Sequence, residues 1–140
     1  SRRQRVLLAV GFLLTVLVGS EHTGAQGDDK PELTLRARPQ VAFAPAEISF
    51  SARLRGGPDD SEEFYCLSAE WDWGDDTVSE SIFDCEPYEP GVSEIRRRFS
   101  RRHSFDRGGR YQVRLSLKRR DDVVAFIRTS VVIQGGLPGE

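Results

Sequence analysis

The chain of 140 residues has no methionine and only two cysteines, two histidines and two lysines. Two cysteines without spaced histidine partners exclude a structural zinc domain. A formal net charge of −2 provides no overall field that would favour nucleic acid or a membrane surface. An aromatic content of 9% argues against disorder. The length suits one domain.

A long apolar run occurs at the N-terminus. Three arginines within the first five residues precede the uncharged stretch 6–18. As a helix this stretch spans about 20 Å, whereas a bilayer core is about 30 Å thick. Small residues follow at 23–25. We therefore expect residues 1–25 to be a cleaved signal peptide. The alternative is an uncleaved anchor, in which residues 6–20 would attach the chain to a membrane. We expect no other contact with a membrane.

The remaining chain divides into a linker (26–31), one domain (32–134) and a flexible tail (135–140). Export would place this domain in the periplasm, on the cell surface or outside the cell. Its two cysteines, Cys66 and Cys85, are an even count, which in an exported protein predicts a disulfide. Closing a loop of this size contributes about 3 kcal/mol.

Alternation of apolar and polar residues runs through the domain, and helical periodicity is absent. Leu33, Leu35 and Ala37, for example, alternate with polar residues. This period of two indicates half-buried strands, and Gly-, Pro- and Asp-rich turns separate them. The strands are predicted at 32–38, 46–55, 64–73, 77–83, 92–100, 110–118 and 122–133. The expected fold is all-β: an antiparallel, immunoglobulin-like β-sandwich of about seven strands.

The strand predicted at 122–133 is apolar on both faces. Val123 and Ile127 lie on one face, and Val124 and Phe126 on the other. Such a strand is covered on both faces or exposes an apolar one. We favour coverage by the segment 41–45, and the alternative is a docking edge.

Charge is separated along the chain. Residues 59–94 contain 13 acidic residues and no Lys or Arg, whereas residues 96–120 contain 11 basic residues and one acid, Asp106. We interpret both as solvated faces, and the alternative is a dipolar surface for a charged partner or for self-association. A net-acidic exported domain without a recognition motif is not expected to bind nucleic acid.

Two segments resemble the PKD domain, a family with an immunoglobulin-like sandwich. Residues 69–76 read AEWDWGDD, and residues 103–117 read HSFDRGGRYQVRLSL. The positions that match the family motifs are Trp71, Asp72, Gly74, Asp75, His103, Gly109, Tyr111, Val113 and Leu115. Phe105 stands where the family has Tyr, and Asp76 where it has Gly.

These matching residues have physical roles in a fold. Trp71 and Trp73 share the inward side of their strand, Gly74 permits a positive φ and Asp75 binds the turn backbone. Tyr111 is placed to act as a tyrosine corner. The resemblance implies that His103 is also structural.

The acidic segment 77–94 is long for this family and contains Cys85. Cys66 shares its parity with Asp72, which places it on the outer face of the predicted strand. The disulfide would then hold the acidic segment against the outside of the sheet. This segment is either a binding surface or a loop that the disulfide merely orders.

Calcium is the one cofactor with candidate ligands, Asp72, Asp75 and Asp76, although turn capping is the favoured role. A single mature histidine and the lack of a marked acid pair lead us to expect that the chain is not an enzyme. The predicted function is a non-catalytic protein-interaction or structural subunit at the cell envelope. The alternative is a carbohydrate-binding module for polysaccharide, with a platform of exposed aromatics. The candidates are Phe64, Phe83, Tyr88 and Phe126.

Overall fold

A computed structural model of the chain describes residues 30–136, which form eight β-strands and no helix. The all-β prediction is confirmed for this range. The predicted signal peptide, most of the linker and residues 137–140 lie outside it. Within the described range no helix is long and apolar enough to cross a membrane. The strands are β1 (Glu32–Arg38), β2 (Val41–Phe43), β3 (Ala46–Arg55), β4 (Ser68–Asp72), β5 (Val78–Ser81), β6 (Arg98–Phe105), β7 (Gly109–Arg119) and β8 (Asp122–Gln134).

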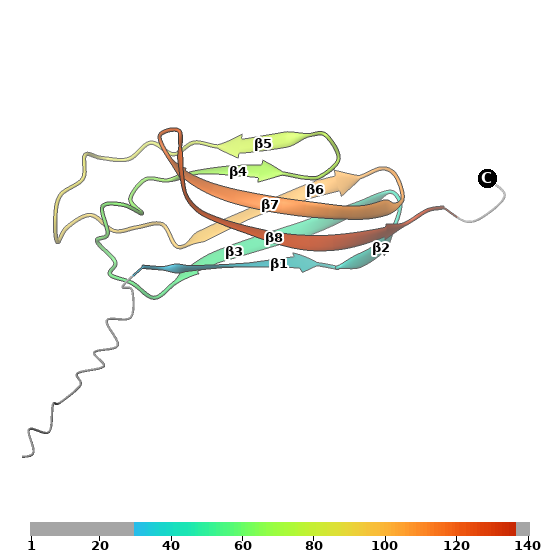
Figure 1. Cartoon of the computed structure of the whole chain (residues 1–140), viewed down its shortest axis with the longest axis horizontal. Helices are drawn as coiled ribbons and strands as arrows, with labels where there is room; N and C mark the ends of the chain where they lie inside the picture. Colours follow the sequence, from blue (N-terminus) through green and yellow to red (C-terminus); the bar gives the residue numbers. More distant parts are fainter. Residues whose placement is uncertain (1–29, 137–140) are drawn as a thin grey trace, which may run out of the picture.

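The strands form two sheets, ordered β1-β3-β6 and β2-β8-β7-β4-β5, which lie one over the other (Figure 1). All neighbours pair antiparallel except β2, which is parallel to β8. The prediction of seven antiparallel strands is therefore wrong in this detail. The strand β2 has only three residues, and its Val41 and Phe43 are exposed. So short a segment shows no recognisable alternation.

The observed strand bounds agree well with the predicted ones where apolar and polar residues alternate over a long stretch. The strands β1 and β3 coincide with the predicted ranges, whereas β4 begins at Ser68 and β6 runs from Arg98 to Phe105 instead of 92–100. Residues 92–97 form a loop in which buried Ile95 donates its N–H to the carbonyl of Asp59, 2.7 Å away. A single buried residue in a loop was thus mistaken for part of a strand.

Aromatic side chains from both sheets meet in the core. The Phe50 ring, on β3, lies 6.1 Å from Trp71 and 5.1 Å from Trp73, measured between centroids. The two indoles stack 5.3 Å apart with an interplanar angle of 6°. All three residues are buried. Each contributes about 2–3 kcal/mol through burial of apolar surface, so this contact accounts for much of the attraction between the sheets.

The expectation that residues 41–45 cover the outer face of β8 is wrong. The strand β2 joins β8 edge to edge over Val132–Gln134 and leaves its outer face free. On that face Phe126 is 52% exposed, with the guanidinium groups of Arg114 and Arg128 at 4.4 and 5.2 Å from its ring centroid. The apolar outer face is therefore covered in part by cationic side chains.

Candidate functional site

The residues of the two sequence motifs meet at one end of the sheets, here called the motif end (residues 73–77 with His103 and Tyr111). Trp73 follows β4, and His103 lies on β6 in the other sheet. Their rings stack at 4.3 Å with an interplanar angle of 2°. His103 Nε2 lies 2.7 Å from Asp75 Oδ2, and Trp73 Nε1 donates to Ser79 Oγ at 2.9 Å. Polar and stacking contacts thus join the two sheets.

The turn after β4 is held by its own carboxylates. Asp72 Oδ1 accepts the N–H of Gly74 at 3.0 Å, and Asp75 Oδ1 accepts the N–H of Thr77 at 3.1 Å and its hydroxyl. Gly74 has φ +73°, and a Cβ there would lie 2.5 Å from the carbonyl oxygen of Gln112. Asp76 also has a positive φ, 67°. Asp tolerates this conformation better than most residues, so Asp76 can occupy the position where the family has Gly.

The ionisation of the Asp75 carboxyl is perturbed by its surroundings. Burial raises the pKa of its carboxyl, but the hydrogen bonds from Thr77 and His103 outweigh burial and hold the pKa below its ordinary value. The carboxylate is therefore ionised at neutral pH.

The other motif residues lie on β7 and the turn before it. Gly109 begins β7, and the Tyr111 hydroxyl donates to the carbonyl of Arg107 at 2.7 Å. This bond ties the start of β7 to the preceding turn. Val113 is fully buried. The matched residues are thus concentrated where the chain crosses from one sheet to the other.

The calcium hypothesis for Asp72, Asp75 and Asp76 stays a prediction. A shallow hollow of about 500 Å³ lies beside Asp75 and Asp76. Within residues 30–136 no group of three or more His, Cys, Asp or Glu side chains is arranged to hold a metal ion. Asp72 and Asp75 already accept hydrogen bonds, so a cation would compete with those bonds for them.

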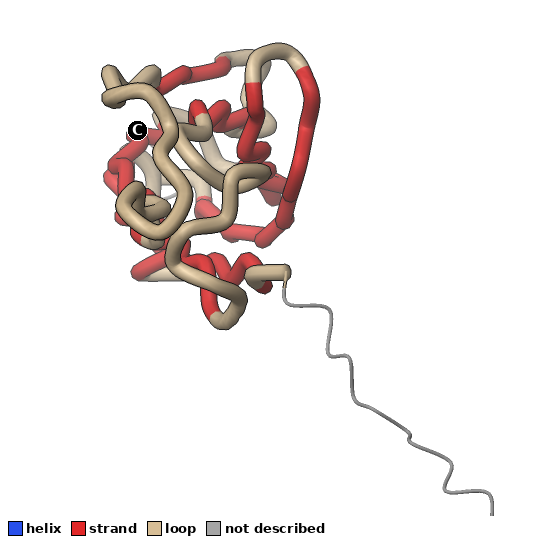
Figure 2. The backbone as a smooth tube through the Cα atoms, turned by 90° about the vertical axis from the view of Figure 1, so that its left-hand side faces the viewer, coloured by secondary structure: helices blue, strands red, loops and turns tan. Residues whose placement is uncertain are grey.

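The opposite end of the strands carries two long loops, residues 56–67 and 82–97, here called the braced end. Figure 2 looks onto this end and shows both loops crossing it. The predicted disulfide between Cys66 and Cys85 is confirmed and joins the two loops. Cys66 lies in the turn before β4 and has φ 54°, so it is not a strand residue as predicted. It nonetheless borders the outward-facing Ser68 and Lys118.

Arg97 provides a second brace. Its guanidinium donates to the carbonyls of Leu54, Gly56 and Gly57 at 3.3, 2.7 and 3.1 Å. It also donates to Asp59 Oδ1 at 2.8 and 3.1 Å. These bonds hold the exit of β3 against the entry of β6. Nothing in the sequence marks Arg97 for this role, because it is the second of three consecutive arginines.

Two tyrosines connect the same loops. The Tyr65 and Tyr88 rings lie 5.4 Å apart. The Tyr65 hydroxyl donates to the carbonyl of Glu86 at 2.5 Å, and that of Tyr88 donates to the carbonyl of Asp60 at 2.6 Å. Gly91 donates its N–H to Asp60 Oδ2 at 3.1 Å. The two loops therefore form one cross-linked unit.

The outer surface of this unit carries many acidic side chains and two large exposed apolar ones. Most of its carboxylates lie on exposed residues: Asp59, Glu62, Glu63, Asp84, Glu86, Glu89 and Glu94. Lys30, Arg97 and Arg119 pair with Glu63, Asp59 and Glu62. In the described part of the chain no cation lies within ion-pair distance of the other four. Ile82 and Val92 are 78% and 70% exposed.

The four aromatics proposed for sugar binding do not form a platform. Phe64 is buried, which corrects its assignment as an exposed residue. Phe83 is half-buried beneath the guanidinium of Arg96, at 3.9 Å. Tyr88 is held by the contacts described above. Phe126 alone of the four is exposed, and it lies on β8.

Comparisons with known proteins assign no family to the chain. No protein-family profile and no curated sequence matches the chain. Among 17 matching chains of solved structure is the CARDB domain of a Pyrococcus furiosus protein in complex with di-metal ions. It has 10% identity, a TM-score of 0.45 and coverage of 77% of this chain and 97% of that one. The CARDB domain has an immunoglobulin-like fold.

A second match corrects the expectation that the chain is not an enzyme. It is the superoxide reductase (neelaredoxin) of Ignicoccus hospitalis, with 10% identity, a TM-score of 0.41 and coverage of 81% of this chain and 86% of that one. Because an enzyme is among the matches, a resemblance to sandwich modules does not exclude catalysis. At this identity no activity, metal or ligand is transferred to this chain.

Proposed function

We propose that the chain is an exported PKD-like domain that binds another secreted or envelope protein through its braced end. The two motifs in their expected order support the family assignment. The disulfide supports an oxidising compartment, because such bonds persist mainly in exported proteins. The apolar segment 6–18 also supports export, because it follows arginines and has the length of a signal peptide's apolar region.

The observation that carries this proposal is the cross-linking of the acidic loops. A disulfide, the Arg97 hydrogen bonds and the paired Tyr65 and Tyr88 hold backbone that would otherwise be free. Ordering loops before binding lowers the entropic cost of association. Loops held on a sandwich are also common recognition elements.

The chemistry of this end favours a protein partner with a basic surface. Exposed Ile82 and Val92 supply apolar contact area, and the surrounding carboxylates supply charge. Protein interfaces combine an apolar centre with a polar rim in this way. Opposite charge on the partner would speed encounter and fix orientation.

Native co-purification with a C-terminal tag tests the proposal. We expect a stoichiometric complex on a native gel, with the partner identified by mass spectrometry. The test variant combines Ile82→Ser, Glu86→Lys and Glu89→Lys, and the matched control combines Val41→Ser, Glu47→Lys and Asp106→Lys, three exposed positions at the motif end of the sheets. The control makes the same chemical changes away from the braced end.

Loss of the complex in the test variant, with retention in the control, would support the proposal. Equal retention in both, or a wild-type chain that migrates alone, would overturn it. Thermal melting of both variants separates lost binding from lost folding.

A further inference from the structure

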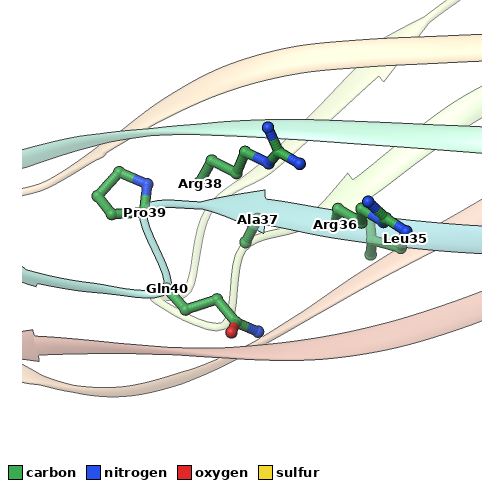
Figure 3. A pocket seen from close by; sticks show the side chains of 6 residues that line it. All are labelled: Leu35, Arg36, Ala37, Arg38, Pro39 and Gln40. Carbon is green, nitrogen blue, oxygen red and sulfur yellow. The ribbon is translucent and has the colours of Figure 1, made fainter.

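The outer face of the three-stranded sheet carries an array of arginines, here called the arginine face. Alternation along β1, β3 and β6 directs every second side chain away from the core. Figure 3 shows Arg38 on one side of β1 and Ala37 on the other. The outward positions include six exposed arginines: Arg36, Arg38, Arg53, Arg55, Arg98 and Arg102.

Strand register places short hydroxyl side chains between these arginines. Arg53 lies between Thr34 and Arg98 across the sheet. In the next outward row Arg36 is followed by two serines, Ser51 and Ser100. The short side chains at the centre of the face therefore leave a depression, and long arginine side chains surround it. The result is a shallow groove of about 480 Å³ lined by arginine, serine and threonine.

The charge on this face is largely uncompensated. Glu47 pairs with Arg102 at 3.7 Å. Within residues 30–136 the other five arginines have no carboxylate within ion-pair distance. Arg53 and Arg98 are direct cross-strand partners, an arrangement in which like charges repel. An anionic ligand would relieve this repulsion.

The spacing of the array suits a polymer with repeated anionic groups. Outward residues lie about 6.8 Å apart along a strand and about 4.8 Å apart across strands. Guanidinium groups bind carboxylate and sulfate in bidentate fashion. Hydroxyls such as those of Ser51 and Ser100 both donate and accept hydrogen bonds, as sugar hydroxyls do.

The face lacks what other anionic partners would use. The large exposed hydrophobic residues of the described chain all lie elsewhere: Val41, Phe43, Val78, Ile82, Val92, Val123 and Phe126. Without apolar side chains the face cannot insert into a lipid interface. It also lacks the apolar centre of a protein interface.

We infer that the arginine face binds an acidic polysaccharide, a sugar polymer that carries carboxylate or sulfate groups. The groove receives the chain lengthwise, and arginines on both sides contact successive anionic groups. This face adjoins the braced end at Arg55 and Arg98 but consists of different residues, and the inference does not depend on the function proposed for that end. One surface would bind a protein while the other held the domain on a glycan.

Calorimetric titration of the full chain with its disulfide intact tests this inference at about 0.15 M salt. The probes are polygalacturonate and heparin, with dextran as the neutral control. The variant Arg36→Ser, Arg53→Ser, Arg98→Ser should weaken binding on the order of tenfold or more through loss of three bidentate contacts. The matched control, Arg107→Ser, Arg110→Ser, Arg128→Ser, removes equal charge elsewhere and should change affinity by less than about threefold.

Three results would overturn the inference: equal weakening in both variants, no binding of either acidic polymer, or tighter binding to phosphatidylglycerol vesicles than to both polymers. If the triple variant fails to fold, the single variants Arg53→Gln and Arg98→Gln replace it, and an unchanged affinity in both is then the overturning result. Variants of the braced end should keep full polysaccharide affinity, which distinguishes this test from that of the proposed function.

Discussion

The imidazole of His103 lies parallel to the indole of Trp73, with 4.3 Å between the ring centroids. The two residues belong to different sheets, and each also makes a polar contact, His103 with Asp75 and Trp73 with Ser79. The two motifs that suggested a PKD-like domain therefore meet in space. Their meeting explains why neither motif alone would specify this end of the fold.

Replacement of Asp75 by Asn should lower the free energy of unfolding by about 1–3 kcal/mol at neutral pH, the usual cost of removing a hydrogen-bonded charge. The pKa of Asp75 is lowered below 3.8 in the folded chain. Its stabilisation is therefore complete above that pH and is lost as the pH falls through the folded value. Urea unfolding of both proteins between neutral pH and about pH 2 measures the difference.

Asp76→Asn is the matched control, because the neighbouring Asp76 is exposed and its positive φ is tolerated by Asn. We expect its stability at neutral pH to stay within about 0.5 kcal/mol of the wild type, as is usual for exposed positions. A difference between Asp75→Asn and wild type that persists unchanged at the acid limit would show that charge is not the cause.

Gly74→Ala should destabilise the domain more than Gly91→Ala. Both glycines have φ +73°, so both substitutions incur the left-handed cost of about 1–2 kcal/mol. A Cβ at Gly74 would also lie 2.5 Å from the backbone oxygen of Gln112, whereas a Cβ at Gly91 meets nothing within 4 Å. Urea unfolding of the two variants checks the order, and equal losses would contradict this steric account.

The double substitution Cys66→Ser, Cys85→Ser should cost about 3 kcal/mol, from a loop with a sequence separation of 19. The chain should still fold, because the aromatic core lies away from this bond. Urea unfolding compared with that of the wild type under reducing conditions provides the measurement. Wild-type stability that does not change on reduction would argue against this contribution.

Added calcium should leave the melting temperature unchanged if the acids of the turn act as caps. Asp72 and Asp75 accept hydrogen bonds from the turn, and these bonds would have to be given up to a cation. Differential scanning calorimetry with and without millimolar calcium tests this. A calcium-dependent rise that disappears in Asp76→Asn would establish the ion site instead.

The fold was predictable where one face of a strand is buried over its whole length. In β3 every second residue from Ile48 to Leu54 is buried, and both ends of that strand were predicted correctly. The strand β2 was missed because its pairing depends on β8, a partner about 90 residues away. Local alternation contains no information about such an edge contact.

The sites were less predictable than the strands. The Cys66–Cys85 bond follows from the cysteine count together with the expected export, and the turn at Gly74 follows from its motif. The arginine face was hidden, because Arg36, Arg53 and Arg98 come from three distant segments. Residues 96–120 form one basic block in the sequence, although their side chains face several directions in the fold. Register between strands is the information that was lacking.

Arg97→Ala should loosen the braced end before it affects the rest of the domain. The Arg97 side chain is 28% exposed, and its guanidinium joins three carbonyls and Asp59, so its loss should cost about 1–3 kcal/mol. Hydrogen exchange should accelerate at the amides of Leu54 and Ile95, which bond across the same junction. The neighbouring Arg96→Ala, which removes only a contact with the Phe83 ring, should cost less than about 1 kcal/mol. Equal exchange in the two variants would mean that Arg97 does not order these loops.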